Sequence, residues 1–295
     1  MPAPLLLLLS LKAFLSPFPH FLLSDTVCTT LVSISLLLTP SHLLSYQTDV
    51  RLDRLSLHLA RLIGLLLLSS SLHTHRAFTT RTLQERAAAS SSRALTALIL
   101  FLCAVHARHH YPAWNFRFAH LTATGAACWF APHFYFALST VSTATPEPRG
   151  VVALLFLDYF MTVAVGLACL AFPHAVLRTL SDVPPNAVSV TLARVLAAIL
   201  IGLAAVSQAG MAYASLEAKR HVHLTRLLTA GPVLILLCLG WAWRCFNDVG
   251  LFVGAGAAIV WGANSALGCA ATVFIQRARD AARASNKEIN KLSPS

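Results

Sequence analysis

Apolar runs recur along the whole chain, and short polar segments separate them. Several of these runs reach the roughly 20 residues that an α-helix needs to cross the hydrocarbon core of a bilayer. Hydrophobic residues make up 57% of the 295 residues and charged residues only 11%, against about 25% charged residues in ordinary soluble domains. A soluble core of this size cannot enclose so much apolar surface. The sequence therefore predicts an all-α integral membrane protein.

The chain also nearly repeats itself at an offset of 133 residues. The segment TDVRLDRLSLHLAR, which begins at Thr48, resembles SDVPPNAVSVTLAR further along. At this offset Asp25 falls on Asp158 and Arg93 falls on Arg226. Matches between leucines mean little in such an apolar chain, but matches between charged residues are rarer. The pattern predicts a tandem duplication.

Each copy contains four apolar runs, so we expect about eight transmembrane helices arranged as two four-helix repeats. The predicted spans are 18–39, 55–74, 94–112 and 118–140 in the first copy, and 151–173, 187–210, 227–244 and 250–273 in the second. An even number of spans gives both copies the same orientation, which predicts parallel repeats.

The predicted domain boundaries follow from these spans. They are an apolar N-terminal lead at 1–17, a first repeat at 18–140, a linker at 141–150, a second repeat at 151–276 and a basic tail at 277–295. The lead has no basic residue ahead of its apolar run, which favours an interfacial segment. A signal peptide and an extra span stay open as alternatives.

The net charge of +11 is distributed as loop charge, which argues against a nucleic-acid partner. The basic residues lie between apolar runs and do not form one polar domain. Of the 22 lysines and arginines, the larger share falls on the side of the linker and the two termini. The positive-inside rule then predicts cytosolic termini, in either an endomembrane or the plasma membrane.

Ionisable residues inside a span are costly and are functional candidates by default. Asp25 and Asp158 lie in the first span of each copy, and Arg61 and Arg194 lie in the second. Further candidates for ligand binding lie nearby in the spans: Thr29, Thr162, His58 and His133. Two interpretations stay open for the arginines. They line a polar cavity and bind an anionic head group, or they extend outward to Asp49 and Asp182.

Histidine clusters are the remaining chemical signal, and we expect no metal and no cofactor from them. They are HTH from His73, HARHH from His106 and HVH from His221. No carboxylate or thiolate stands beside them, as a converging metal site requires. The seven cysteines lie mostly in apolar runs and are interpreted as small apolar side chains. The small residues of GLFVGAGAAIVWGANSALG predict close helix packing or a homo-oligomer contact.

The run HLARLIGLLLL and the small-residue fourth span resemble those of an uncharacterised set of multispan membrane proteins from filamentous fungi. The order of a span, a proline, an Asp loop and LAR is also similar to small four-span bacterial membrane families. The resemblance to the fungal set implies a lineage and no chemistry.

Three functions are compatible with these residues. The one we favour is binding or transport of a small lipophilic or amphipathic molecule, with the lipid bilayer as the other partner. The alternatives are a structural or assembly subunit and a membrane-embedded enzyme acting on a lipid or terpenoid. We do not expect an enzyme, because no nucleophile constellation and no phosphate-binding loop is present.

Overall fold

The computed structural model describes residues 18–80, 82–138, 149–213 and 215–292. Within these ranges the chain is all-helical, with one isolated bridge between Thr48 and Trp114. The prediction of an all-α fold is confirmed. The predicted lead at 1–17, most of the linker and the last three residues of the tail lie outside the described residues.

The described helices fall where the sequence predicts its spans, with two short helices between them. In the first half they are α2 (Phe18–Leu38), α3 (Pro40–Ser45), α4 (Arg54–Thr80), α5 (Leu83–His110) and α6 (Phe116–Leu138). In the second half they are α7 (Arg149–Ala171), α8 (Pro173–Leu180), α9 (Ala187–Met211), α10 (Leu216–Ala242) and α11 (Asp248–Leu292).

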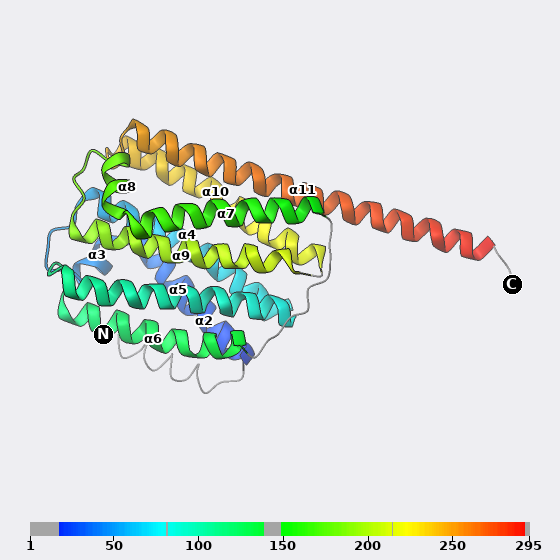
Figure 1. Ribbon diagram of the computed structural model, residues 1–295, viewed down its shortest axis with the longest axis horizontal. Helices are drawn as coiled ribbons and strands as arrows, with labels where there is room; N and C mark the ends of the chain where they lie inside the picture. The colour runs from blue at the N-terminus through cyan, green and yellow to red at the C-terminus, as the bar shows by residue number, and fades with distance from the viewer. Residues whose placement is uncertain (1–17, 81, 139–148, 214, 293–295) are drawn as a thin grey trace.

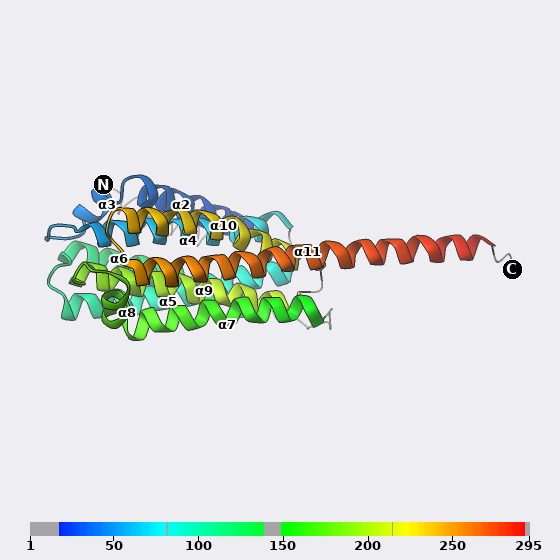
Figure 2. The ribbon, with the colours of Figure 1, turned by 90° about the horizontal axis from the view of Figure 1, so that it is seen from above.

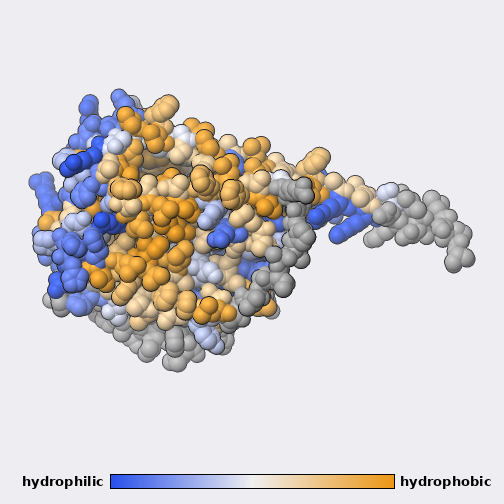
Figure 3. Space-filling view, in the orientation of Figure 1, coloured by the Kyte–Doolittle hydropathy of each residue, from blue (hydrophilic) through white to orange (hydrophobic). Residues whose placement is uncertain are grey.

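Seven helices of the described chain are long and apolar enough to cross a membrane, judged by length and composition. They are α2, α4, α5, α7, α9, α10 and α11. The space-filling view shows apolar side chains over the middle of the bundle and polar side chains gathered at one end (Figure 3). This distribution is typical of a protein whose middle is surrounded by lipid.

The long helices run side by side along the long axis of the molecule (Figures 1 and 2). One end of the bundle carries α3 and α8, and we call it the cap end. The opposite end carries the α4–α5 and α9–α10 turns, and α11 extends well beyond it (Figure 1). We call this opposite end the tail end.

Helices α4 and α9 form the centre of the bundle. They pack against each other, and their most apolar windows are 78% and 67% buried, against 33% for α2 and 28% for α7. Helix α2 packs on α4, and α7 packs on α9. Across the middle, α5 packs on α9 and α10 packs on α4. The two halves of the chain are therefore joined through their second and third long helices.

The third long helix of each half begins earlier than its apolar run predicts. Thr82 caps α5 by accepting a hydrogen bond from the Glu85 amide at 3.4 Å, and Ser215 caps α10 in the same way through Ala218. Such N-caps satisfy amides that the helix leaves unpaired. The two helices therefore begin before the predicted spans at 94 and 227. Residues expected in a loop, among them Arg93 and Arg226, lie inside these helices.

Backbone contacts at the cap end recur in both halves. The Asn115 amide donates to the Gln47 carbonyl at 3.2 Å, and the Asn247 amide donates to the Leu180 carbonyl at 3.1 Å. The side-chain amides of the two asparagines donate to the carbonyls one residue earlier, at 3.0 and 3.1 Å. Each asparagine thus ties the start of the fourth long helix to the short helical segment of its own half.

Candidate functional site

A buried ion pair between Asp158 and Arg226 is the centre of a polar cluster in the second half of the chain, which we call the second cluster. Arg226 Nε donates to Asp158 Oδ2 at 3.3 Å, and Ser207 Oγ donates to the same oxygen. Trp261 donates its indole N–H to Asp158 Oδ1, and the Arg226 guanidinium lies 5.6 Å from the centre of this ring. Both charged side chains are almost fully buried, at 1% and 0% exposure. Four helices, α7, α9, α10 and α11, therefore meet at one carboxylate.

An equivalent cluster surrounds Asp25 in the first half. Arg93 Nε donates to Asp25 Oδ2 at 3.0 Å and to Thr74 Oγ1 at 3.1 Å. Thr29 Oγ1 donates to Asp25 Oδ1 at 3.2 Å. The Arg93 guanidinium lies 5.4 Å from the centre of the Trp129 ring, a distance at which the ring face attracts the cation. Here α2, α4, α5 and α6 supply the residues.

Both clusters lie deep along the helices. Arg93 follows Leu83 by ten residues, which places it about 15 Å from the start of α5 at the rise of an α-helix. Arg226 lies at the same depth in α10. A charge buried this completely is stabilised only by a partner of opposite sign and by hydrogen bonds.

The first cluster differs from the second in how completely its donors are used. Arg93 Nη1 and Nη2 are buried and have no hydrogen-bond partner among the described residues. In the second cluster, Arg226 Nη2 donates to Ser207 Oγ at 3.1 Å and also to the Leu203 carbonyl. Only Nη1 of Arg226 is left without a partner in the described chain. Arg93 thus keeps two guanidinium nitrogens without a partner, where Arg226 keeps one.

His133 also belongs to the first cluster. Its Nε2 lies 3.8 Å from Asp25 Oδ2, and its ring packs edge-on against Phe21 with 4.6 Å between the ring centres. The side chain is fully buried, and neither ring nitrogen has a hydrogen-bond partner within the described residues. At the corresponding place in α11 the chain has Ser265. We call the set Asp25, Arg93, Trp129 and His133 the repeat-1 site.

Residues 23–270 match a protein family described as Domain of unknown function (DUF8292). The match covers both polar clusters and most of the chain. The protein belongs to the DUF8292 family. No curated protein and no solved structure matches the chain.

The sequence identifies half of each ion pair of this DUF8292 chain. Asp25 and Asp158 are predicted site residues, and the predicted Thr29 and Thr162 lie beside them. Thr162, however, donates to the Asp158 backbone carbonyl at 2.7 Å and not to the carboxylate. Arg93 is missed as the partner of Asp25 because hydropathy places it in a loop. The signal was present, since Arg93 and Arg226 stand at the same offset as the two aspartates.

The other predicted candidates lie elsewhere in the DUF8292 domain. Arg61 is half-buried and lies over the Trp243 ring, 5.6 Å from its centre. His58 is buried, with its ring centre 5.3 Å from that of Phe246. Arg194 is half-buried in α9. Neither Arg61 with Asp49 nor Arg194 with Asp182 forms an ion pair within the described chain.

A separate polar group lies toward the tail end, where the two halves of the DUF8292 domain meet. Arg76 bridges Glu85 at 3.4 Å and Glu217 at 3.1 Å. The rings of His73 and His221, expected on the cytosolic side, lie in α4 and α10 with centres 5.8 Å apart. These bridges connect α4 to α5 and to α10, the third long helices of the two halves. No group of three residues suited to a metal ion occurs in the described part of the chain.

Proposed function

We propose that this DUF8292 protein is an integral membrane protein built from two parallel four-helix repeats, and that it binds a small amphipathic molecule at the repeat-1 site. The molecule carries a hydrogen-bond acceptor, such as a carboxylate or a phosphate. Binding comes before any transport step, so the proposal rests on the binding alone.

Contacts that recur at an offset of 132 or 133 residues support the duplication. They include the two ion pairs, the two Arg–Trp contacts and the paired backbone contacts of Asn115 and Asn247. A further contact joins two equivalent positions directly, since Asp53 and Asn186 are 133 residues apart in the sequence. Asn186 Nδ2 donates to Asp53 Oδ2 at 2.8 Å. Two equivalent residues touch each other only where a pseudo-twofold axis passes between them. We infer that this axis runs between the starts of α4 and α9.

The direction of the axis supports parallel repeats in a membrane. Each half enters and leaves the bundle at the tail end (Figure 1). The seven apolar helices support insertion. The excess of basic residues on the side of the linker and tail favours cytosolic termini.

The observation that carries the binding proposal is that two guanidinium nitrogens of Arg93 lack a partner at the repeat-1 site, whereas only one nitrogen of Arg226 does. Arg93 Nη1 and Nη2 and the ring nitrogens of His133 are buried together without hydrogen-bond partners in the described structure. A buried polar group left without a partner is costly in an apolar surrounding. An anionic acceptor would accept from the Arg93 guanidinium and from the single N–H of a neutral His133 ring. It would take the role that the hydroxyl and carbonyl of α9 have in repeat 2.

The position of α6 supports access from the lipid. Helix α6 lies at the edge of the bundle and packs mainly on α5 (Figure 1). Trp129 is only half-buried, so part of the site wall reaches the surface. Pro132 inside α6 removes one backbone hydrogen bond directly before His133, and such a residue weakens helix regularity. These features favour a lateral entrance beside α6.

The test compares two matched variants. Arg93→Leu and Arg226→Leu each remove one buried arginine from an equivalent place. The protein is purified in mild detergent, incubated with a lipid extract of the producing cells and examined by native mass spectrometry. We expect Arg226→Leu to retain an extra bound mass that Arg93→Leu loses, and His133→Ser to reduce that mass.

Two outcomes would contradict the proposal. One is an identical set of bound masses in the two arginine variants. The other is a wild-type protein that carries no bound mass, together with a repeat-1 variant that still loses stability. The second outcome would favour the structural role, which the well-satisfied Asp158 cluster already fits.

A further inference from the structure

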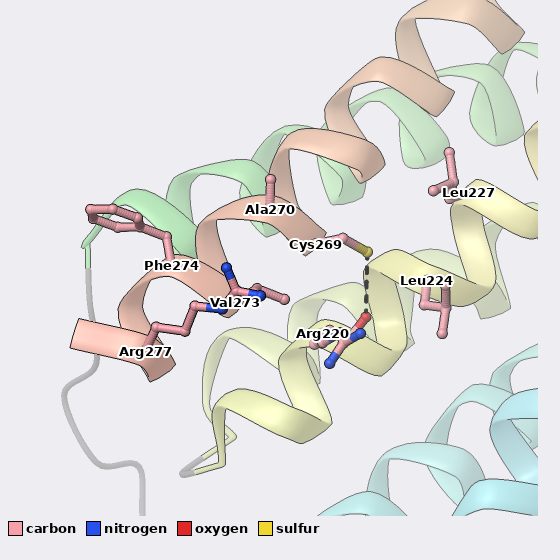
Figure 4. Close-up of a pocket in the computed structure, with 8 residues that line it drawn as sticks. All are labelled: Arg220, Leu224, Leu227, Cys269, Ala270, Val273, Phe274 and Arg277. Atoms are coloured by element: carbon pink, nitrogen blue, oxygen red, sulfur yellow. Dashed lines mark hydrogen bonds between the residues drawn. The ribbon is translucent and has the colours of Figure 1, made fainter. Parts of the chain in front are cut away.

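A second and separate feature lies on the surface between α10 and α11, toward the tail end (Figure 4). It is a groove with a volume of about 370 Å³. Apolar side chains form most of its lining, and two arginines complete it. The lining residues are Arg220, Leu224, Leu227, Cys269, Ala270, Val273, Phe274 and Arg277.

Small side chains on α11 open the groove. Cys269 faces α10 and its Sγ donates to the Arg220 carbonyl at 3.9 Å, and Ala270 also lines the groove (Figure 4). From Arg220 to Leu227 the groove follows α10 for seven residues, which is about 10 Å of helix. Such a length accommodates the upper part of an acyl chain, but it is longer than a small soluble anion needs.

The two arginines provide charge at one end of this apolar groove. Arg220 and Arg277 are both exposed. Arg277 extends from α11 toward α10 (Figure 4). None of the eight lining residues is acidic. Asp280, one turn further along α11, accepts from Gln276 at 3.2 Å, and no ion pair with Arg277 forms in the described chain.

We propose that this groove binds one anionic phospholipid. The phosphate lies between Arg220 and Arg277, and an acyl chain lies along Leu224, Leu227 and Val273. Basic pockets between helices at the cytoplasmic side of a membrane are typical sites for anionic head groups. The apolar floor distinguishes this ligand from free phosphate, which would leave the floor exposed to water.

The site has no counterpart in the first half, because Ala87 stands at the position that corresponds to Arg220. It shares no residue with the repeat-1 site. The groove therefore represents a property of the second half alone, in addition to the function proposed above.

The experiment titrates the purified protein with phosphatidylglycerol and separately with phosphatidylcholine, and counts bound lipid by native mass spectrometry. A basic residue near a membrane surface contributes about fivefold to the affinity for anionic lipid. We expect Arg220→Ala and Arg277→Ala each to weaken phosphatidylglycerol binding by about that factor. We expect the matched control Arg283→Ala, an exposed arginine of α11 outside the groove, to change it less than twofold. Ala270→Phe fills the groove without changing charge and should also weaken binding.

Three results would overturn the proposal. They are equal binding of phosphatidylcholine, an equal loss in Arg283→Ala, and competition by glycerol 3-phosphate at the concentrations at which phosphatidylglycerol binds. Thermal unfolding checks that each variant is folded, and both arginines are exposed enough to be replaced without loss of packing. Arg93→Leu should leave phosphatidylglycerol binding unchanged, so this experiment and that of the repeat-1 site can fail independently.

Discussion

Each buried arginine of this protein is held by a carboxylate, a hydroxyl and an aromatic ring. For Arg226 these are Asp158, Ser207 and Trp261. An ion pair of this kind contributes little net stability, because removing two charges from water is expensive. It nevertheless makes the two partners depend on each other, since neither charge is tolerated alone at this depth.

We therefore predict that Arg226→Leu destabilises the protein by about 3–5 kcal/mol, because Asp158 is left as an uncompensated buried charge. The double variant Arg226→Leu with Asp158→Asn should recover most of this loss, since the neutral amide carries no charge. Its oxygen can still accept from Trp261, and its NH2 group can donate to the Ser207 hydroxyl. Denaturant unfolding in detergent measures both changes. A double variant that is less stable than the single variant would show that the charge pair is not the reason.

The sequence reveals the aspartates of the two clusters but not their arginines. An aspartate in the middle of an apolar run stands out, as Asp158 does. Arg93 stands near the start of its run, within a segment of alanines and serines that hydropathy alone assigns to a loop. Pairing also depends on how α5 packs against α2 and α4, and the linear pattern holds no information on that packing. The repeat at an offset of 133 residues indicates the two arginines more clearly, because it aligns Arg93 with Arg226.

At the scale of helices, small side chains decide how closely the elements approach. Two glycines of α11 lie in close contact with other helices of the chain. A Cβ on Gly250 would lie 2.1 Å from the Leu180 carbonyl oxygen, and one on Gly254 would lie 3.2 Å from the Leu237 side chain. Gly256 has open space around it. The small-residue face predicted from the sequence thus serves contacts of α11 with α8 and α10, and its use in a homo-oligomer stays a prediction.

Gly250→Ala should destabilise the protein by about 1–3 kcal/mol, because the backbone of α8 must move to admit the methyl group. Gly256→Ala is the matched control in the same helix. It should be neutral or stabilising by up to about 1 kcal/mol through helix propensity. Thermal unfolding in detergent compares the two, and equal losses would contradict the close contact with Leu180.

Helix positions are predictable from this sequence, whereas helix starts are less so. The apolar runs of α7 and α9 are enough to predict where these two helices lie in the sequence. The start of α5 depends on Thr82 as a cap, three residues before Glu85. Capping chemistry of this type extends a helix into polar sequence, and a search for apolar runs does not register it.

For the whole molecule, the packing of α5 on α9 and of α10 on α4 joins the two halves. We predict that the halves remain associated after the chain is cut between them. A protease site inserted after Thr145 and cleaved in detergent should give two fragments that elute together in size-exclusion chromatography. Fragments that separate would show that the linker is needed to hold the two halves together.

A second prediction at this scale concerns topology. Reporter tags after Thr145 and after Ser295 should lie on the same side of the membrane, and a tag after Asn247 should lie on the opposite side. Protease protection in sealed vesicles measures this. A tag after Thr145 that is on the opposite side from one at the C-terminus would exclude parallel repeats.

Under the duplication proposed above, the contact between Asp53 and Asn186 has a consequence for the history of the fold. In an assembly of two identical chains, the residue on the symmetry axis meets its own copy, so an acid would face an acid. Joining the two units in one polypeptide frees each position to change by itself, and a donor can then stand opposite an acceptor. The same freedom allows a histidine in one half to replace what is a serine in the other, so that one unit can specialise while its twin preserves the scaffold.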